Sequence, residues 1–271
     1  MKTSRVLLMA AAGLFLLAQP QMMHAASVLV DFSASYNDVT APPFPFTDNT
    51  DPAAVTQATG PLNGSLTHYS TSSTATANFG SLLVNTAASG VSDENVNSHS
   101  KAGWVDSLTI LGSGQGTLKL YFTLSGSLAA ADGGGSSVAT GTYAVNGDVN
   151  GNFFARVGTE HSNIGLIGFA LTDFSVTTGD FTFGTPFSFN ISLEGSAGYG
   201  GDTGATSDSA SASNVQLTLV GIEVYDFPSN TLVSSPSISS ASGVVYAVPE
   251  PSRAVLLLLG AGALLCRRRK S

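Results

Sequence analysis

Asp148, Asn150 and Asn152 come closest to a metal site in this chain of 271 residues. Their side-chain oxygens recur at alternate positions, as the first ligands of a helix–loop–helix calcium loop do. The sixth position of such a loop is glycine and the twelfth a bidentate glutamate, but this chain has Phe153 and Thr159 there. The polar side chains of a hairpin turn explain the same residues without an ion. We therefore expect no cofactor, with calcium at these three residues as the weaker alternative.

The histidines and carboxylates give no recognisable catalytic pattern. His68, His99 and His161 are widely separated, so a metal cluster or a Ser-His-Asp triad would have to be assembled by the fold. The sequence motifs of serine hydrolases, zinc proteases and phosphate-binding loops do not occur. Glutamate is scarce, and no pair suggests the two facing carboxylates of a glycosidase. We expect no enzymatic activity; a secreted hydrolase with a fold-assembled site is the weaker alternative.

Aromatic side chains offer a different chemistry, because exposed rings can act as platforms for sugars. The candidate rings are Trp104, Tyr69, Tyr121, Tyr143 and Tyr199. Trp104 shares its two-residue phase with Leu108 and Ile110, so we expect it in the core. Tyr121 lies on the face opposite its apolar neighbours and is exposed if that face meets water. A carbohydrate-binding module is therefore a second functional hypothesis.

The last 24 residues carry three parts in a fixed order: Pro249-Glu250-Pro251, an apolar run over residues 254–266, and a basic end. The prolines block helix propagation and hold an extended segment that an enzyme groove could read. The apolar run can enter a bilayer, and the basic residues after it prefer the cytoplasmic side. Everything upstream would then be cargo on the outer face.

The apolar run is short for a membrane helix. Its 13 residues extend about 20 Å as a helix, against a hydrocarbon core of about 30 Å. Such a helix spans the membrane only marginally, which suits a temporary handle better than a permanent anchor. An ordinary C-terminal anchor is the alternative.

This tail resembles the PEP-CTERM sorting signal of Gram-negative bacteria. The matching parts are the motif Pro249, Glu250 and Pro251, the membrane segment 254–266, and the basic end Arg267, Arg268, Arg269 and Lys270. The resemblance implies processing by an exosortase, a membrane transpeptidase-like enzyme, and export linked to exopolysaccharide and the biofilm matrix. It covers about a tenth of the chain, and it identifies a sorting label that proteins of many functions share.

The N-terminus has the three regions of a secretory signal peptide. Lys2 and Arg5 form a basic region, residues 6–18 are apolar, and a polar stretch ends in small residues at Ala25 and Ala26. Cleavage is expected after one of these two alanines. We therefore expect the secretory translocon and, transiently, the inner membrane as partners of this chain.

Removing both ends leaves a strongly acidic body. Lys101, Lys119 and Arg156 are its three bases, beside 17 acidic residues, which gives a net charge of −14. Such an anion repels nucleic acid and anionic lipid headgroups, so we expect no nucleic-acid partner. The only cysteine, Cys266, lies in the apolar run. The body must therefore be stabilised by an ordinary core rather than by disulfides.

Period-two alternation of apolar residues dominates the body and predicts β-strands. It is clearest from Val28 to Ala34, from Leu118 to Leu124, and from Phe181 to Leu193, where Pro186 predicts an edge position or a bulge. In residues 215–225 the apolar phase switches near Gly221, as a bulge or a change of sheet requires. No sustained helical stripe occurs in the body.

Glycine-containing turns and polar loops separate these runs. We predict turns at Gly112–Gly116, Asn63-Gly64, Asp132–Gly135, Asn146-Gly147 and Thr178–Asp180, and long loops at Thr40–Pro61 and Gly195–Ser213. The fold prediction is an all-β, single antiparallel β-sandwich, with a jelly roll as one form of it. Barrel and solenoid share the same alternation.

The expected organisation is a signal peptide at 1–26, a β-sandwich body at 27–246, and a sorting tail at 247–271 carrying a single membrane helix. The expected function is that of an exported, non-enzymatic protein of the cell surface or the extracellular matrix of a Gram-negative bacterium, with exopolysaccharide as a candidate partner.

Overall fold

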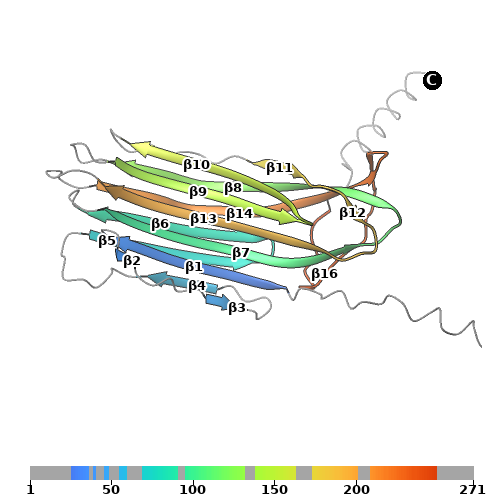
Figure 1. The fold of residues 1–271 in the computed structure, drawn as a ribbon, viewed down its shortest axis with the longest axis horizontal. Coiled ribbons are helices and arrows are strands. Elements are labelled where there is room, and N and C mark those ends of the chain that lie inside the picture. The colour runs from blue at the N-terminus through green and yellow to red at the C-terminus, as the bar shows by residue number, and fades with distance from the viewer. Residues whose placement is uncertain are drawn as a thin grey trace, which may run out of the picture.

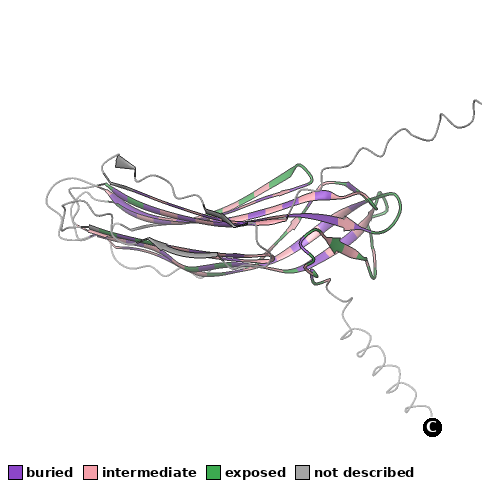
Figure 2. Cartoon of the chain, turned by 90° about the horizontal axis from the view of Figure 1, so that it is seen from below, coloured by how far each residue is buried: buried purple, intermediate pink, exposed green. Residues whose placement is uncertain are grey.

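The computed structural model describes residues 26–36, 39–40, 46–48, 55–59, 69–90, 95–131, 138–162, 173–200 and 208–248. This part of the chain is all-β, with two antiparallel sheets of eight strands and no helix (Figure 1). The two sheets lie face to face as the layers of a sandwich (Figure 2). The predicted all-β fold with two antiparallel sheets is confirmed.

In sheet A, six of the eight strands follow the order β10 (Asn152–Ser162), β9 (Val138–Val149), β13 (Phe187–Gly200), β7 (Val96–Ile110), β1 (Ser27–Tyr36) and β2 (Val39–Thr40). The other two are β16 (Ile238–Ser240), which pairs with β7, and β3 (Phe46–Asp48), which pairs with β1. Sheet B has the order β11 (Phe174–Thr177), β8 (Gln115–Ala131), β14 (Asp208–Phe227), β6 (Ser81–Gly90), β5 (Tyr69–Asn78) and β4 (Val55–Thr59), while β12 (Phe181–Thr182) pairs with β8 and β15 (Thr231–Leu232) with β14.

The alternation seen in the sequence is the alternation of burial. Val28, Val30 and Phe32 of β1 point into the sandwich, as do Leu118 and Leu120 of β8. The outward residues between them are half-buried. Because side chains of a strand alternate between its faces, each predicted apolar face became one wall of the core.

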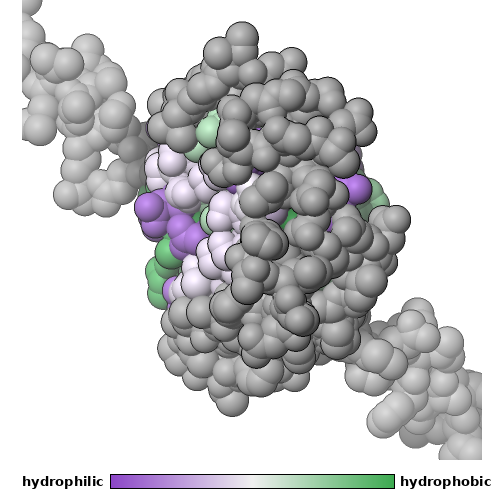
Figure 3. All heavy atoms as spheres, turned by 90° about the vertical axis from the view of Figure 1, so that its left-hand side faces the viewer, coloured by the Kyte–Doolittle hydropathy of each residue, from purple (hydrophilic) through white to green (hydrophobic). Residues whose placement is uncertain are grey.

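The interior changes in character along the strands. The phenylalanine-rich core occupies the end where the body begins and ends, and it contains Trp104, Phe122, Phe181, Phe187, Phe189 and most of the buried leucines. The opposite end holds a second group, the alanine cluster, formed by Ala88, Val96, Ala130, Ala139, Ala197, Tyr199 and Ala210. Figure 3 views this opposite end, where many of the described side chains are hydrophilic or of intermediate hydropathy.

The loop predicted at Gly195–Ser213 is wrong. β13 continues to Gly200 and β14 begins at Asp208, so only residues 201–207 lie outside the described part of the chain. The small residues still alternate, and Ala197 and Ala210 are buried. The glycine, serine and alanine residues here fill a narrow space between the two sheets and do not indicate a turn.

The hairpin turn predicted at Asn146-Gly147 is also wrong. Both residues lie within β9, and the chain turns at Asn150-Gly151, where φ is 52° and 79°. This is the backbone of a tight primed hairpin turn. Gly147 faces the core against the Phe154 ring, where an added Cβ would lie 2.1 Å from a ring carbon. Close packing, not chain reversal, requires this glycine.

Two predictions about proline and bulges have opposite outcomes. Pro186 lies in the turn before β13, which runs between β9 and β7 without a register shift, so both the edge position and the bulge predicted at Pro186 are wrong. Because Pro186 precedes the strand, its missing N–H falls outside the hydrogen-bond ladder of β13. The bulge near Gly221 is confirmed, because the pairing of β14 with β8 shifts register between Leu219 and Gly221.

The remaining turn and loop predictions are partly tested. The chain bends at residues 112–114 before β8, and residues 178–180 connect β11 to β12, as predicted. The loop predicted at Thr40–Pro61 contains β3 and β4. The predicted turns at Asn63-Gly64 and Asp132–Gly135 lie outside the described residues.

Both ends of the body meet the same strand. Ser27, the first residue of β1, pairs with Val105 of β7, and Tyr246 bonds to Asp106, the next residue of β7. The start of β1 and strand β16 accordingly lie at one end of the sandwich (Figure 1). The predicted signal peptide and sorting tail lie outside the described residues, except for Ala26 and residues 247–248. No helix of the described part is long and apolar enough to cross a membrane.

Candidate functional site

A buried carboxylate fastens the last residues of the body to β7. Asp106 has no exposed surface and accepts four hydrogen bonds. Its Oδ1 accepts from the backbone N–H of Ser107 at 2.7 Å and of Ser242 at 3.1 Å. Its Oδ2 accepts from the hydroxyls of Ser242 and Tyr246, each at 2.7 Å. We call Asp106, Ser242 and Tyr246 the Asp106 clamp.

The clamp is reinforced by contacts to both sheets. The Tyr246 ring is 7% exposed and meets the Phe189 ring edge-on at 5.7 Å. The backbone N–H of Ile222 in β14 donates to the carbonyl of Ala247 at 2.9 Å, and the N–H of Ala241 donates to the carbonyl of Ser107 at 2.9 Å. The closing segment, residues 241–247, therefore packs as part of the sandwich.

Burial and the neighbouring Asp106 charge raise the pKa of Tyr246 far above its ordinary value. The phenol therefore stays protonated, and its O–H donates a hydrogen bond to Asp106. A carboxylate can only accept, and four donors satisfy it at this fully buried position. Sequence reasoning missed this cluster, but a signal was present. Asp106 shares the buried phase of Trp104 and Leu108, and a buried charge requires partners.

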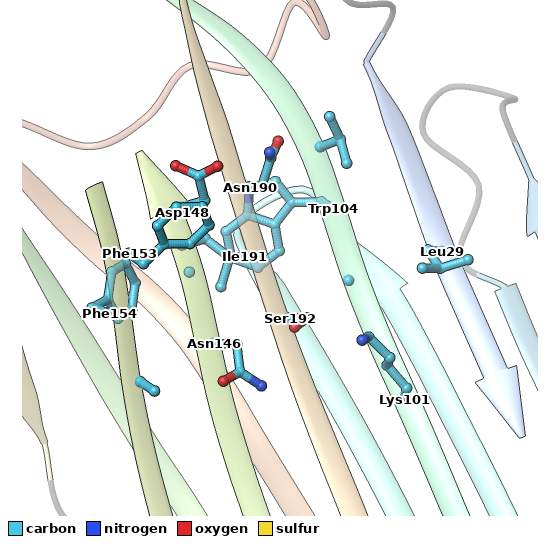
Figure 4. Close-up of a pocket in the computed structure, with 14 residues that line it drawn as sticks. Leu29, Lys101, Trp104, Asn146, Asp148, Phe153, Phe154, Asn190, Ile191 and Ser192 are labelled. Carbon is cyan, nitrogen blue, oxygen red and sulfur yellow. The ribbon is translucent and has the colours of Figure 1, made fainter. Parts of the chain in front are cut away.

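The outer face of sheet A carries a second candidate, a groove of about 480 Å³ that crosses five strands (Figure 4). Phe153 of β10, 82% exposed, stands on one side and Leu29 of β1 on the other. Between these two side chains the groove is lined by the small residues Gly103 and Ser192. The polar side chains around it are Asn146, Asp148, Asn190 and Lys101. The Oδ1 atom of Asn190 is buried and has no hydrogen-bond partner among the described residues.

Lys101 at the groove's edge is already neutralised. Its Nζ lies 2.7 Å from Glu194, whose other oxygen lies 3.7 Å from Nε2 of His99. The neighbouring His99 and the closer Lys101 ammonium hold the pKa of Glu194 at about 2, well below its ordinary value. Neither ion of the pair is therefore free to bind an oppositely charged ligand.

The three residues considered for calcium surround the β9–β10 turn. Asp148 accepts the N–H of Gly151 at 2.8 Å, and the Asn150 amide donates to the carbonyl of Asp180 at 2.9 Å. The Asn152 amide donates to two carbonyls of the turn itself. The bonds of Asp148 and Asn152 stabilise the turn itself, and the bond of Asn150 ties the turn to the connection between β11 and β12. Among the described residues, no group of three or more histidine, cysteine, aspartate or glutamate side chains could hold a metal ion.

The predicted aromatic rings occupy different environments. Trp104, Tyr143 and Tyr199 are buried, which confirms the core position of Trp104 and removes the two tyrosines as surface platforms. Tyr121 is half-buried on the outer face of sheet B and, like Tyr225, donates its hydroxyl to Glu223. The side chain of Tyr69 lies outside the described residues.

Sequence reasoning did not select Phe153, which is the most exposed aromatic side chain of the groove. Its signal was the pair Phe153-Phe154 in a strand, since neighbours in a strand face opposite ways and one ring must point outward. Among the predicted histidines, only the His99 side chain is described, and it contacts Glu194.

The sorting motif Pro249, Glu250 and Pro251 and the basic end Arg267–Lys270 lie outside the described residues. Comparison with known proteins adds no assignment, since no family model, curated protein or solved structure matches this chain.

Proposed function

We propose that this chain is an exported, non-enzymatic protein that a C-terminal PEP-CTERM tail delivers to the cell surface or matrix of a Gram-negative bacterium. In this proposal the signal peptide takes the chain to the secretory translocon. The segment 254–266 then holds it at the inner membrane, and an exosortase-type enzyme processes it near Pro249-Glu250-Pro251. We propose the jelly-roll type for the sandwich, and the repeated passage of the chain from one sheet to the other, as from β7 to β8 and from β8 to β9, supports it.

The observation that supports the proposal best is the placement of both body ends on adjacent residues of β7. A cargo domain whose two ends leave together can stand away from a membrane on one short stalk. The closing segment is fixed as far as Ala247, two residues before the motif. The sandwich is therefore complete without the tail, as cargo released by processing must be.

The basic end provides the test. Changing Arg267, Arg268, Arg269 and Lys270 to glutamine removes the charges that orient the short membrane segment, so we expect mislocalised, unprocessed protein in cell fractions of the native host. Lys119→Gln, which removes one charge from the body, should leave delivery unchanged. Normal delivery of the quadruple variant, or of a chain ending before Pro249, would contradict the proposal.

A second candidate function is binding of a neutral polysaccharide in the groove of sheet A. The exposed ring of Phe153 lines the groove together with the amides of Asn146 and Asn190, a combination suited to the apolar face and the hydroxyl groups of a sugar. Among the described residues that line the groove, Lys101 is the one base and is paired with Glu194, while Asp148 adds a negative charge, so an anionic polysaccharide is disfavoured relative to a neutral one.

Affinity electrophoresis in gels containing a neutral polysaccharide tests this second candidate. Phe153→Ala should abolish retardation of the protein. Val157→Ala provides the control, because Val157 is a 64% exposed side chain of the same strand that does not line the groove. Equal mobility of wild type and Phe153→Ala in every polysaccharide gel would remove this candidate.

A further inference from the structure

We propose that the Asp106 clamp is a fold-dependent stop, which protects the chain up to Ala247 from peptidases and confines processing to the residues from Val248 onward. The inference rests on the proposed function, because it concerns the segment that leads into the sorting motif. Its physical part, protection of the closing segment by the fold, stands on the contacts of the described residues.

The stop is located by the last fixed groups of the chain. Tyr246 bonds to Asp106 and the carbonyl of Ala247 accepts from Ile222. Val248 alone separates Ala247 from Pro249. The sorting motif therefore begins within two residues of a position that is hydrogen-bonded to sheet B.

A peptide that a groove reads in extended form must present free backbone groups and free side chains over several consecutive residues. The closing segment is exposed at Gly243 and Val245, but anchored residues flank both, so it presents no free run of several residues. The carbonyl of Val244 accepts from the hydroxyl of Ser240 at 2.8 Å, and the N–H of Gly243 donates to the carbonyl of Ser240. Ser242 and Tyr246 are buried. Cleavage before Val248 therefore requires the clamp to open first.

The clamp also couples processing to folding. Asp106 lies in the middle of sheet A and Ser242 lies 136 residues later, so their bond forms only after β7 has been placed and the closing segment has returned to it. An unfolded body would expose the whole segment from Ser240 to Val248. Folded cargo would acquire one defined C-terminus, whereas unfolded cargo would be cut at several upstream bonds.

The experiment compares digestion of the detergent-solubilised full chain by a broad-specificity endopeptidase, with the cut sites read by mass spectrometry. Tyr246→Phe removes the hydroxyl bond to Asp106 but keeps the ring packing. Val245→Ala is the matched control, because Val245 is 90% exposed within the same segment. We expect wild type and Val245→Ala to be cut at Val248 and beyond, and Tyr246→Phe to be cut between residues 241 and 247 about tenfold faster than wild type.

Circular dichroism in the near ultraviolet shows that each variant is folded before digestion, and Ser242→Ala provides a second clamp variant should Tyr246→Phe unfold. Equal cutting of residues 241–247 in wild type and in a folded clamp variant would overturn the stop, as would rapid cutting there in folded wild type. A tail that remains intact in the host contradicts the proposed processing instead, and it leaves the digestion result as the test of the stop.

Discussion

The two ends of the sandwich use the same alternation to build different interiors. The phenylalanine-rich core separates the sheets with large rings, such as Phe122 of sheet B against Phe154 of sheet A, whose ring centroids lie 6.1 Å apart. Towards the alanine cluster, hydroxyls bond directly from sheet to sheet, as between Ser73 of β5 and Ser98 of β7 at 2.7 Å. One end is therefore stabilised mainly by buried apolar area and the other by close approach and hydrogen bonds.

This difference shows how a body poor in large residues stays folded without disulfides. The end with the phenylalanine-rich core also holds both ends of the body and the Asp106 clamp. The far end needs only small side chains because its sheets lie close enough for serine and threonine to meet. We expect stability to be concentrated where the tail attaches.

The largest effect should come from a matched pair of substitutions on β8. Phe122→Ala removes a fully buried ring and should lower the free energy of unfolding by about 3–5 kcal/mol. Ala130→Gly, at the far end of the same strand, should lower it by about 0.5–1 kcal/mol. Urea denaturation curves measure both, and equal losses would break the contrast between the two ends.

Asp106→Asn should lower the free energy of unfolding somewhat less, by about 2–4 kcal/mol. The amide N–H₂ of asparagine would face hydroxyl donors from which the carboxylate now accepts hydrogen bonds. The measurement is thermal melting. The control is Asp173→Asn, because Asp173 is an exposed aspartate. A melting temperature unchanged by Asp106→Asn would mean that the clamp contributes nothing to the stability of the tail-bearing end.

The hydroxyl pair at the far end should give a smaller effect. In a double-mutant cycle of Ser73→Ala and Ser98→Ala, we expect a coupling energy of about 1 kcal/mol, because either single change leaves a buried hydroxyl with one partner fewer. The cycle is read from urea unfolding of the four proteins. Strictly additive losses would show that the cross-sheet bond does not hold the sheets together.

The smallest effect should come from the outer face, where Glu194 meets His99 and Lys101. Its pKa, about 2 in the fold, lies below the ordinary value of 4.5. Its stabilisation is therefore fully present above about pH 4.5 and is lost as the pH falls towards 2. Glu194→Gln should lower stability by at most about 1 kcal/mol at pH 7. The difference from wild type should shrink in melts below pH 4, and a constant difference would contradict this assignment.

Alternation predicted the walls of the core because burial of one face imposes a period of two, as Val28, Val30 and Phe32 illustrate. The prediction failed where it rested on composition instead of alternation. The small residues of 195–213 suggested a loop, but the spacing between the sheets at that end requires small side chains. The distance between sheets is a property of the whole sandwich, so a local stretch of sequence does not reveal it.

The Asp106 clamp was beyond local reasoning for a similar reason. Its partners, Ser242 and Tyr246, lie 136 and 140 residues away, and only the return of the closing segment to β7 brings them together. The alternation of β7 did place Asp106 on the buried face. A buried carboxylate of this kind can be read from sequence as a demand for partners, without saying which residues supply them.

The intact mass of the mature protein isolated from its native host tests the proposed sorting most directly. We expect an N-terminus at Ala26 or Ser27 and a C-terminus between Val248 and Pro251, with the sandwich and its clamp retained. A mature protein that ends at Ser271 and stays in the membrane would contradict both the proposed sorting and the view of this body as released cargo.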